Sequence, residues 1–291
     1  MARTILASVA LALAVGLGAA TAEGRGGTSP PLDTVDIVAG GWKPDVRAAK
    51  RYARGRAGSV WFAFIDPYGR SHGLHAGRTA PMASLFKPLV MAAYLRRPSV
   101  KDRALREWER DLLGPMIRRS ANEPATRLRD MLGAGPIKAT ARKAGMRDFS
   151  YSSVWGLSRT SARDQARFFL RLDRWIPKRH EDYARSLLKN IVSSQRWGVA
   201  DARPEGWELF FKGGWGVGTG RVNHQAALYE QAKCNSALSV MTEFSPSNGY
   251  GTETIEGVAE RLLQGIRKVH CGKRIEHGTA HPANDGPEKG R

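Results

Sequence analysis

The sequence predicts a mixed α/β (α+β) fold: an antiparallel sheet built from both ends of the chain, flanked by helices, with an inserted all-helical lobe. Three observations lead to this prediction. Residues 58–77 read as a strand, a turn and a returning strand, residues 101–172 carry apolar side chains at helical spacing, and strand patterns resume after Gly206. Because helices separate the two groups of strands, one shared sheet is the simplest way to bury both groups.

Residues 1–22 have the features of an export signal peptide. Arg3 precedes an apolar run from Ile5 to Ala20, and small side chains favour cleavage after Ala22. The run is short and rich in alanine, so no stable membrane anchor is expected, with a retained signal anchor as the alternative. No cysteine directly follows the run, so a lipoprotein anchor has no attachment point. We therefore expect a secreted or periplasmic, extracytoplasmic protein.

The rest of the chain divides by composition. Residues 23–43 are rich in Gly, Pro and Thr and are expected to form a linker. Residues 44–270 are expected to form one domain, in which the helical lobe covers about 100–205. Residues 271–291 lack apolar periodicity and are expected to be disordered. No internal repeat is visible, and we expect a monomer.

The domain is expected to begin with a helix and a hairpin. Residues 44–54 place Val46, Ala49 and Tyr52 on one helical face. The apolar run at 58–65 is typical of a buried strand, the turn 66–69 folds it back, and 72–77 forms the returning strand. The next apolar run, Pro81–Tyr94, predicts a buried helix.

The helical lobe follows from apolar spacing interrupted by proline and glycine. Residues 101–119 predict a helix with Leu105, Trp108, Leu112, Met116 and Ile117 on its inner face. Pro124 disfavours helix at the preceding residue, so that helix is expected to end near 120–124. Helix is expected again over 128–145, with a break at 133–136, and from Thr160 onward.

The last third of the domain returns to strands. Residues 207–215, 221–229 and 236–244 predict three strands, with a glycine-rich turn at 216–220. The closing helix is marked by apolar residues from Ile255 to Val269.

The two cysteines of an exported chain suggest a disulfide. Cys234 lies between two predicted strands and Cys271 follows the closing helix. About 17 helical residues at ~1.5 Å each span the length of about nine strand residues at ~3.3 Å each, so the helix end returns to the start of the strand. A Cys234–Cys271 bridge is therefore reasonable, with two unpaired thiols as the alternative.

The net charge of +19 at pH 7 is compatible with three interpretations: nucleic-acid binding, attraction to anionic envelope polymers, or an arginine-rich solvated surface. No nucleic-acid partner is expected, because the chain is exported and lacks a reader motif. Lys and Arg are spread along the chain, which favours a solvated surface. Electrostatic association with an anionic cell envelope is the alternative.

Three short motifs carry the chemistry. Ser84-x-x-Lys87 places a nucleophile and a base one helical turn apart at a helix N-terminus, where backbone N–H groups favour developing negative charge. Ser120-x-Asn122 follows in the helical lobe, and Lys212-Gly213-Gly214 lies on a later strand. A second S-x-x-K match at Ser186–Lys189 has none of these partners, so S-x-x-K alone is weak. Without partners, Ser84 would be a capping serine and Ser120 a helix stop.

From about Val46 to Val269, the chain resembles class A β-lactamase-like serine hydrolases, members of the penicillin-recognising serine enzymes, which carry these motifs in this order. The resemblance implies that Ser84 is acylated with Lys87 as base. It implies that Ser120 protonates the leaving nitrogen, that Asn122 holds the substrate amide, and that Lys212 positions the substrate carboxylate.

The resemblance implies further contacts. The N–H groups of Ser84 and Trp215 are the expected oxyanion donors, and Arg221 is the expected carboxylate-binding arginine, with an ordinary exposed residue as the alternative. Gly213 and Gly214 allow a substrate backbone to lie against the strand edge.

The chain departs from this family at the residue that activates water. Class A β-lactamases carry a glutamate between the S-x-N element and the next helix. Residues 146–159 contain no glutamate, and Asp148 lies too early to replace it. Gly213 also removes a hydroxyl found in the family motif. Acylation is therefore expected, but fast β-lactam turnover is not.

Other chemistries fit less well. His72 and His75 on a returning strand would point to opposite faces, so no metal site is expected there. A weak metal site in the tail, at His270, Cys271, His277 and His281, is the remaining alternative. No cofactor is expected.

We therefore predict an exported serine hydrolase that forms an acyl-enzyme at Ser84 with β-lactams or related acyl donors and deacylates slowly. One alternative is a D-alanyl-D-alanine carboxypeptidase or esterase acting on cell-wall peptides. The other is a non-catalytic module that binds the cell wall.

Overall fold

The protein is described from a computed structural model, which covers residues 41–216, 218, 220–266, 269 and 271. The predicted signal peptide and most of the predicted linker lie outside the described residues, as does the tail from residue 272. Among the described helices, none is both long enough and apolar enough to cross a membrane.

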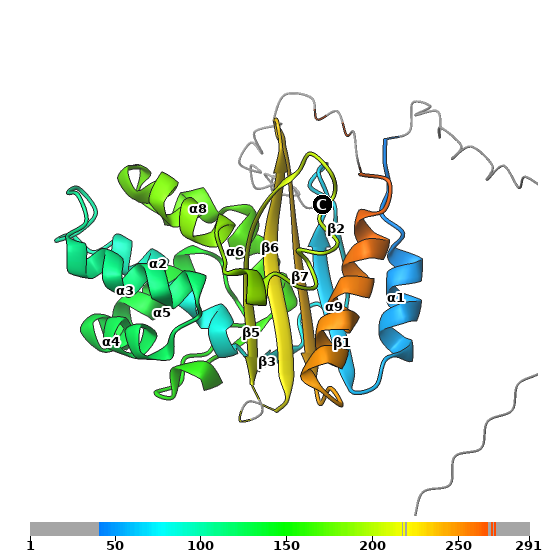
Figure 1. Cartoon of the computed structure of the whole chain (residues 1–291), viewed down its shortest axis with the longest axis horizontal. Helices are drawn as coiled ribbons and strands as arrows, with labels where there is room; N and C mark the ends of the chain where they lie inside the picture. Colours follow the sequence, from blue (N-terminus) through cyan, green and yellow to red (C-terminus); the bar gives the residue numbers. More distant parts are fainter. Residues whose placement is uncertain (1–40, 217, 219, 267–268, 270, 272–291) are drawn as a thin grey trace, which may run out of the picture. The chain divides into compact units, whose positions relative to one another are not determined.

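A five-stranded antiparallel sheet forms the centre of the domain, with strand order β2-β1-β7-β6-β5. The strands are β1 (Ser59–Ile65), β2 (Ser71–Leu74), β5 (Glu208–Gly216), β6 (Val222–Gln231) and β7 (Cys234–Glu243). β1 pairs along its whole length with β7, from Ser59 opposite Glu243 to Ile65 opposite Ala237. The two ends of the domain therefore meet in one sheet, which confirms the predicted fold class (Figure 1).

A buried carboxylate sets the hairpin between β1 and β2. Asp66 accepts hydrogen bonds from the backbone N–H groups of Tyr68 and Arg70, and its second oxygen accepts from Arg70 Nε at 2.6 Å. The same oxygen lies 3.0 Å from His72 Nε2. β2 ends at Leu74, three residues earlier than the predicted returning strand, because His75 takes a left-handed conformation with φ +45°.

Two helices cover one face of the sheet, α1 (Val46–Gly55) and α9 (Asn248–Leu263). They pack closely because Gly257 of α9 has no side chain: a Cβ there would lie 2.4 Å from the ring of Tyr52 on α1. The predicted inner face of α1 is correct, since Ala49 is fully buried and Val46 and Tyr52 pack against the core.

The helical lobe lies on the other side of the sheet (Figure 1). Its members are α2 (Phe86–Leu95), α3 (Glu107–Arg118), α4 (Asn122–Leu132), α5 (Ala134–Lys143), α6 (Ala162–Leu170), α7 (Leu172–Trp175) and α8 (Glu181–Lys189). All ten residues of α2 are buried, and α6 contributes Ala162 and Ala166 to a core cluster with Trp61 of β1 and Met241 of β7.

Several predicted boundaries in the lobe were wrong. α3 begins at Glu107 rather than near 101, because the Glu109 side chain accepts from the Arg106 N–H in a capping box. Pro124 does not lie between helices but in the first turn of α4. A proline is tolerated there because the N–H groups of a first turn have no partner within the helix. The sequence analysis also missed α8 and the short pair β3 (Thr79–Pro81) with β4 (Arg159–Ser161).

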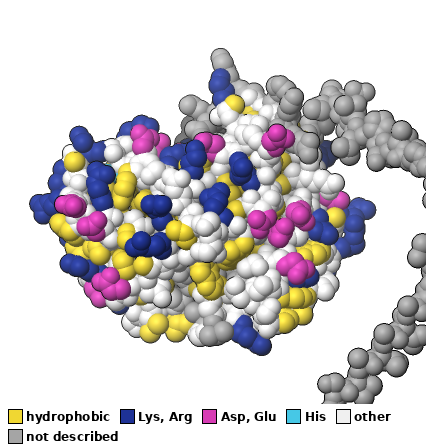
Figure 2. All heavy atoms as spheres, in the orientation of Figure 1, with side chains coloured by type: hydrophobic (Ala, Val, Ile, Leu, Met, Phe, Trp, Pro, Cys, Tyr) yellow, Lys and Arg dark blue, Asp and Glu magenta, His cyan; other side chains and the backbone are white. Residues whose placement is uncertain are grey.

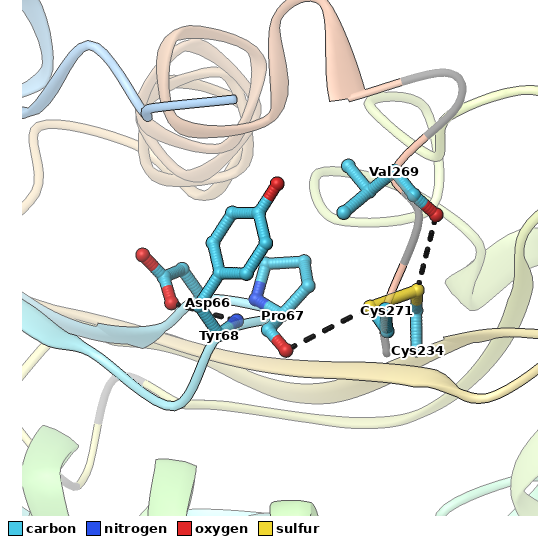
Figure 3. Close-up of a disulfide and its surroundings, with 6 residues drawn as sticks. All are labelled: Asp66, Pro67, Tyr68, Cys234, Val269 and Cys271. Atoms are coloured by element: carbon cyan, nitrogen blue, oxygen red, sulfur yellow. Dashed lines mark hydrogen bonds between the residues drawn. A yellow bond between two sulfur atoms is a disulfide. The ribbon is translucent and has the colours of Figure 1, made fainter. Parts of the chain in front are cut away.

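The structure joins Cys234, at the start of β7, to Cys271, beyond α9 (Figure 3). The Val269 carbonyl oxygen lies 3.2 Å from the sulfur of Cys234, and the Pro67 carbonyl oxygen lies 3.8 Å from that of Cys271. The disulfide therefore holds the end of the described chain beside the β1–β2 turn.

On the face shown in Figure 2, Lys and Arg side chains alternate with Asp and Glu rather than gathering in one patch. This distribution fits the predicted solvated surface better than a single basic docking face.

Candidate active site

The segment that carries Ser84 is held in an unusual backbone conformation. It runs from β3 through a short 3₁₀ turn, Ala83–Leu85, into α2, and Ala83 has φ +46°, which is uncommon for a residue with a side chain. The Met82 N–H donates to the Ser158 carbonyl oxygen at 2.7 Å, and His224 Nε2 lies 3.0 Å from the Pro81 carbonyl oxygen. Strain of this kind is kept where neighbouring contacts impose it, as they do on both sides of this turn.

The edge strand β5 approaches the Ser84 turn at Gly214. A Cβ on Gly214 would lie 2.8 Å from the Ser84 nitrogen, 2.9 Å from the Leu85 nitrogen and 3.0 Å from the Met82 carbonyl oxygen. Real side chains do not come this close to backbone atoms, so only glycine fits here. Trp215 follows Gly214 on β5. The N–H groups of Ser84 and Trp215 therefore lie on two segments that are in direct contact.

Lys87 lies at the centre of the site, fully buried on α2. Its Nζ donates to Ser84 Oγ at 2.8 Å, Asn122 Oδ1 at 2.9 Å and Ser120 Oγ at 3.1 Å, and also to the Ser120 carbonyl oxygen. Ser120 takes a left-handed conformation, φ +57°, immediately before α4. This conformation lets both its hydroxyl and its carbonyl oxygen reach the same amine.

Lys212, on β5, approaches Ser120 from the other side. It is fully buried, and its Nζ donates to Ser120 Oγ at 3.0 Å and to the Gly213 carbonyl oxygen at 2.7 Å. The structure thus brings together Ser84, Lys87, Ser120, Asn122, Lys212 and Gly214 from the sequence prediction. Ser84 and Ser120 stay partly accessible while both lysines are buried.

Burial changes the protonation of both lysines. It lowers the pKa of Lys87 to about 7, because the charged ammonium loses its hydration. Burial also holds the pKa of Lys212 well below its usual range, and the nearby charge of Lys87 lowers it further. A neutral Lys87 can donate two N–H groups to the Ser120 carbonyl and Asn122 Oδ1, which leaves its lone pair for the Ser84 hydroxyl proton.

Tryptophans surround the site, and the sequence analysis assigned a role only to Trp215. The ring centroid of Trp155 lies 5.1 Å from Lys87 Nζ. Trp197 and Trp215 meet edge to face at 5.7 Å beside Gly213, where a Cβ would lie 3.4–3.5 Å from both rings. Trp155 lies between the Ser120-x-Asn122 and Lys212-Gly213-Gly214 motifs. Its aromatic side chain in a polar stretch was the only feature of the sequence that could have pointed to it.

His224 was also missed. Its ring is fully buried behind the Ser84 turn. Nδ1 lies 2.9 Å from the Asn223 carbonyl oxygen and 3.2 Å from the Thr242 nitrogen, and Nε2 lies 3.0 Å from the Pro81 carbonyl oxygen. Burial lowers the pKa of His224 to about 4, although the backbone oxygens of Asn223 and Pro81 favour its charged form.

Arg221, Asp148 and Ser186 make no hydrogen bond or ion pair with the described residues of this cluster. Arg221 precedes β6 with an exposed side chain, and it makes no hydrogen bond or ion pair with any residue that the structure describes. Asp148 accepts from Ser161 Oγ at 2.6 Å and pairs with Arg163 at 2.8 Å. Ser186, of the second S-x-x-K match, donates to the Tyr183 carbonyl oxygen.

A metal site has no basis within the part of the chain that is described. No group of three His, Cys, Asp or Glu side chains there could hold a metal ion. Cys271 is occupied by the disulfide, and His270, His277 and His281 lie outside the described residues.

Solved structures similar to this chain include a β-lactamase from Sphaerobacter thermophilus, with TM-score 0.65, 21% identity, and coverage of 76% of this chain and 96% of that one. PBP-A gives TM-score 0.65 at 16% identity, covering 76% and 95%. The class A β-lactamase of Mycobacterium abscessus gives TM-score 0.64 at 19% identity, covering 76% and 99%. At these identities the likeness concerns the fold alone.

No curated protein matches the chain. The model of the Beta-lactamase enzyme family matches residues 109–266, a range that contains Ser120, Asn122 and Lys212 and begins after Ser84 and Lys87. More than half of the sequence thus fits the family model, and the fold and motif order agree with it. The chain belongs to the β-lactamase enzyme family.

Proposed function

We propose that this protein is an exported serine hydrolase that forms an acyl-enzyme at Ser84 with β-lactams or related acyl donors and releases the acyl group slowly. The observation that carries the proposal is the convergence of two buried lysines on two serines, with Lys87 Nζ 2.8 Å from Ser84 Oγ and Lys212 Nζ 3.0 Å from Ser120 Oγ. Burying two amines costs stability, and neither lysine is paired with a carboxylate among the described residues, so a functional role explains the arrangement better than a structural one.

In the acylation step, Ser84 Oγ attacks the carbonyl carbon of the acyl donor and its proton passes to the lone pair of Lys87 Nζ. The carbonyl oxygen gains negative charge, which we expect the N–H groups of Ser84 and Trp215 to stabilise. The C–N bond then breaks, and the departing nitrogen takes the Ser120 hydroxyl proton. Ser120 is reprotonated from one of the two lysines that touch it.

Slow deacylation is proposed because the loop carboxylates are already engaged. Asp148 is bound by Ser161 and Arg163, which hold its pKa below the usual range against the opposing effect of burial. Asp164 accepts from the backbone N–H groups of Arg147 and Asp148. Neither carboxylate is therefore free to activate water at a Ser84 ester.

A peptide acyl donor is the second candidate. β5 is an edge strand whose Gly213 and Gly214 have no side chains, so an extended peptide could lie along it. A structurally similar PBP-A variant was solved as an acyl-enzyme complex with penicillin G. A D-alanyl-D-alanine carboxypeptidase or esterase would use the same nucleophile.

The direct test is covalent labelling with a fluorescent penicillin. We expect one label per chain, lost in Ser84→Ala and kept in Ser186→Ala, which removes the serine of the other S-x-x-K match. A stoichiometric nitrocefin burst without turnover would support slow release, whereas sustained hydrolysis would contradict it. Absence of any Ser84-dependent label would favour the non-catalytic cell-wall binding module.

Export is tested separately. We propose cleavage of the signal peptide after Ala22, so the protein recovered outside the cytoplasm is expected to begin at Glu23 when its N-terminus is sequenced. An intact Met1 on the recovered chain would contradict cleavage.

A further inference from the structure

Trp155 is fixed in place by three contacts. Its ring stacks on Phe86 at 6.0 Å with an interplanar angle of 19°, and its Nε1 donates to Thr126 Oγ1 at 3.0 Å. Its face meets Lys87 Nζ at 5.1 Å. The neighbouring side chains of Val154 and Leu157 are 61% and 40% exposed, so Trp155 is turned inward within a segment whose other apolar residues face outward.

The loop that carries Trp155 is also anchored at both ends. The Arg163–Asp148 ion pair at 2.8 Å joins its two stems, and Arg129 Nη1 donates to the Ser153 carbonyl oxygen at 3.0 Å. The Ser152 N–H donates to Ser158 Oγ at 3.0 Å. With these contacts in place, the indole is part of the wall of the site.

Oxygen atoms and the Trp155 ring together surround Lys87 Nζ. An amine nitrogen bonded to its own carbon has three tetrahedral directions left. Lys87 Nζ already meets oxygens of Ser84, Ser120 and Asn122, and the Trp155 ring covers a further side. Once Ser84 is acylated, its Oγ no longer presents a proton to the amine lone pair, and the Trp155 ring remains as the cover against water on its side of Nζ.

We propose that Trp155 is a positioning residue that keeps water away from Lys87 and so prolongs the life of the acyl group on Ser84. The inference rests on the proposed function. In hydrolysis, a water oxygen adds to the ester carbonyl carbon while its proton goes to a base. The ester C–O bond then breaks, and Ser84 Oγ takes a proton back. Lys87 is the base closest to Ser84, and the indole blocks the approach of water to it.

The experiment measures how fast the label leaves. Mature protein is labelled with fluorescent penicillin, excess reagent is removed, and label per folded chain is followed over time. In Trp155→Ala we expect release about 10- to 100-fold faster than in the unchanged protein, because Lys87 can then act as a general base on water. Trp155→Phe keeps a ring over the amine and is expected to release at close to the unchanged rate.

Trp42→Ala is the matched control. Trp42 also packs edge to face on a phenylalanine, Phe64 at 6.3 Å, and donates through Nε1 to the Gln264 carbonyl oxygen at 2.8 Å, but it lies outside the site. Its loss is expected to leave label release unchanged. If Trp155→Ala does not fold by circular dichroism, Trp155→Leu takes its place with the same expectation.

The pH dependence of release separates this role from general loosening. Release from Trp155→Ala should slow as the pH falls, because Lys87 must be neutral to take the proton from water, and renewed hydration of the amine would move this loss toward higher pH. If Trp155→Ala releases its label at the same rate as the unchanged protein, or releases it without this pH dependence, the inference is overturned. The proposed function is not affected by that result. No label on either protein overturns both, and label on Trp155→Ala alone shows that the indole blocks acylation instead.

Discussion

The pH dependence of acylation follows from the burial of Lys87. Burial lowers the pKa of this amine to about 7, and only the neutral amine can accept the Ser84 proton. The labelling rate is therefore expected to rise with pH and level off above about 8. At pH 5, two units below the pKa, about 1% of the amine is neutral, so labelling should be ~100-fold slower than on the plateau.

The assay is stopped-flow labelling with a fluorescent penicillin between pH 5 and 9, at reagent concentrations low enough to report the free enzyme. Lys87→Arg keeps a permanent positive charge and should lose at least about 100-fold of the labelling rate at every pH. Lys189→Arg changes the lysine of the other S-x-x-K match and should leave the profile as it is. A rate that stays flat from pH 5 to 9 in the unchanged protein would refute Lys87 as the base.

Three further predictions concern other parts of the structure. Gly214→Ala places a Cβ 2.8 Å from the Ser84 nitrogen, so labelling should fall at least ~10-fold while circular dichroism stays unchanged; normal labelling would mean that β5 can move away. Replacing Cys234 and Cys271 by serine removes a link across 37 residues and should lower the free energy of unfolding in guanidinium by about 4 kcal/mol, whereas an unchanged midpoint would argue against the bridge. His224 stays neutral when folded, because burial lowers its pKa to about 4, while the unfolded chain binds a proton below about pH 6.5. Stability is therefore full above pH 6.5 and falls as the pH drops toward 4, by about 2 kcal/mol at pH 5; His224→Gln should lose less over this interval, and an equal loss would assign the acid sensitivity to other groups.

The sequence was sufficient to predict the fold class and most of the residues that converge in the candidate site, because these depend on local patterns. Ser84 and Lys87 are one turn apart on a helix, and glycine in a strand indicates close approach of another backbone. The boundary errors have separate local causes, such as a left-handed residue or a side-chain cap, which apolar spacing does not reveal. The Glu109 carboxylate, for example, accepts from the Arg106 N–H and delays the start of α3.

The roles of Trp155 and His224 could not be predicted in this way. Each contacts a partner distant in sequence: Trp155 stacks on Phe86, and His224 Nε2 lies 3.0 Å from the carbonyl oxygen of Pro81, 143 residues away. Indole and imidazole side chains occur in many cores, so their type carries no signal until the fold has placed them. The contact expected of Arg221 is with a substrate carboxylate and stays a prediction; its exposed side chain makes no hydrogen bond or ion pair with a described residue.

The pairing of β1 with β7 joins strands from the two ends of the domain, which affects the order in which the site forms during folding. Lys212 reaches Ser120 across 92 residues, and β5, which carries Lys212, belongs to the part of the sheet contributed by the last third of the chain. If the protein is exported as proposed, a chain emerging from the export channel presents Ser84 long before Lys212, and before β5, the strand proposed to complete the oxyanion site. Because such long-range strand pairing forms late, the serine gains its reactivity only when folding is nearly complete. Labelling by penicillin would then serve as a measure of how much of the exported protein has reached its final structure.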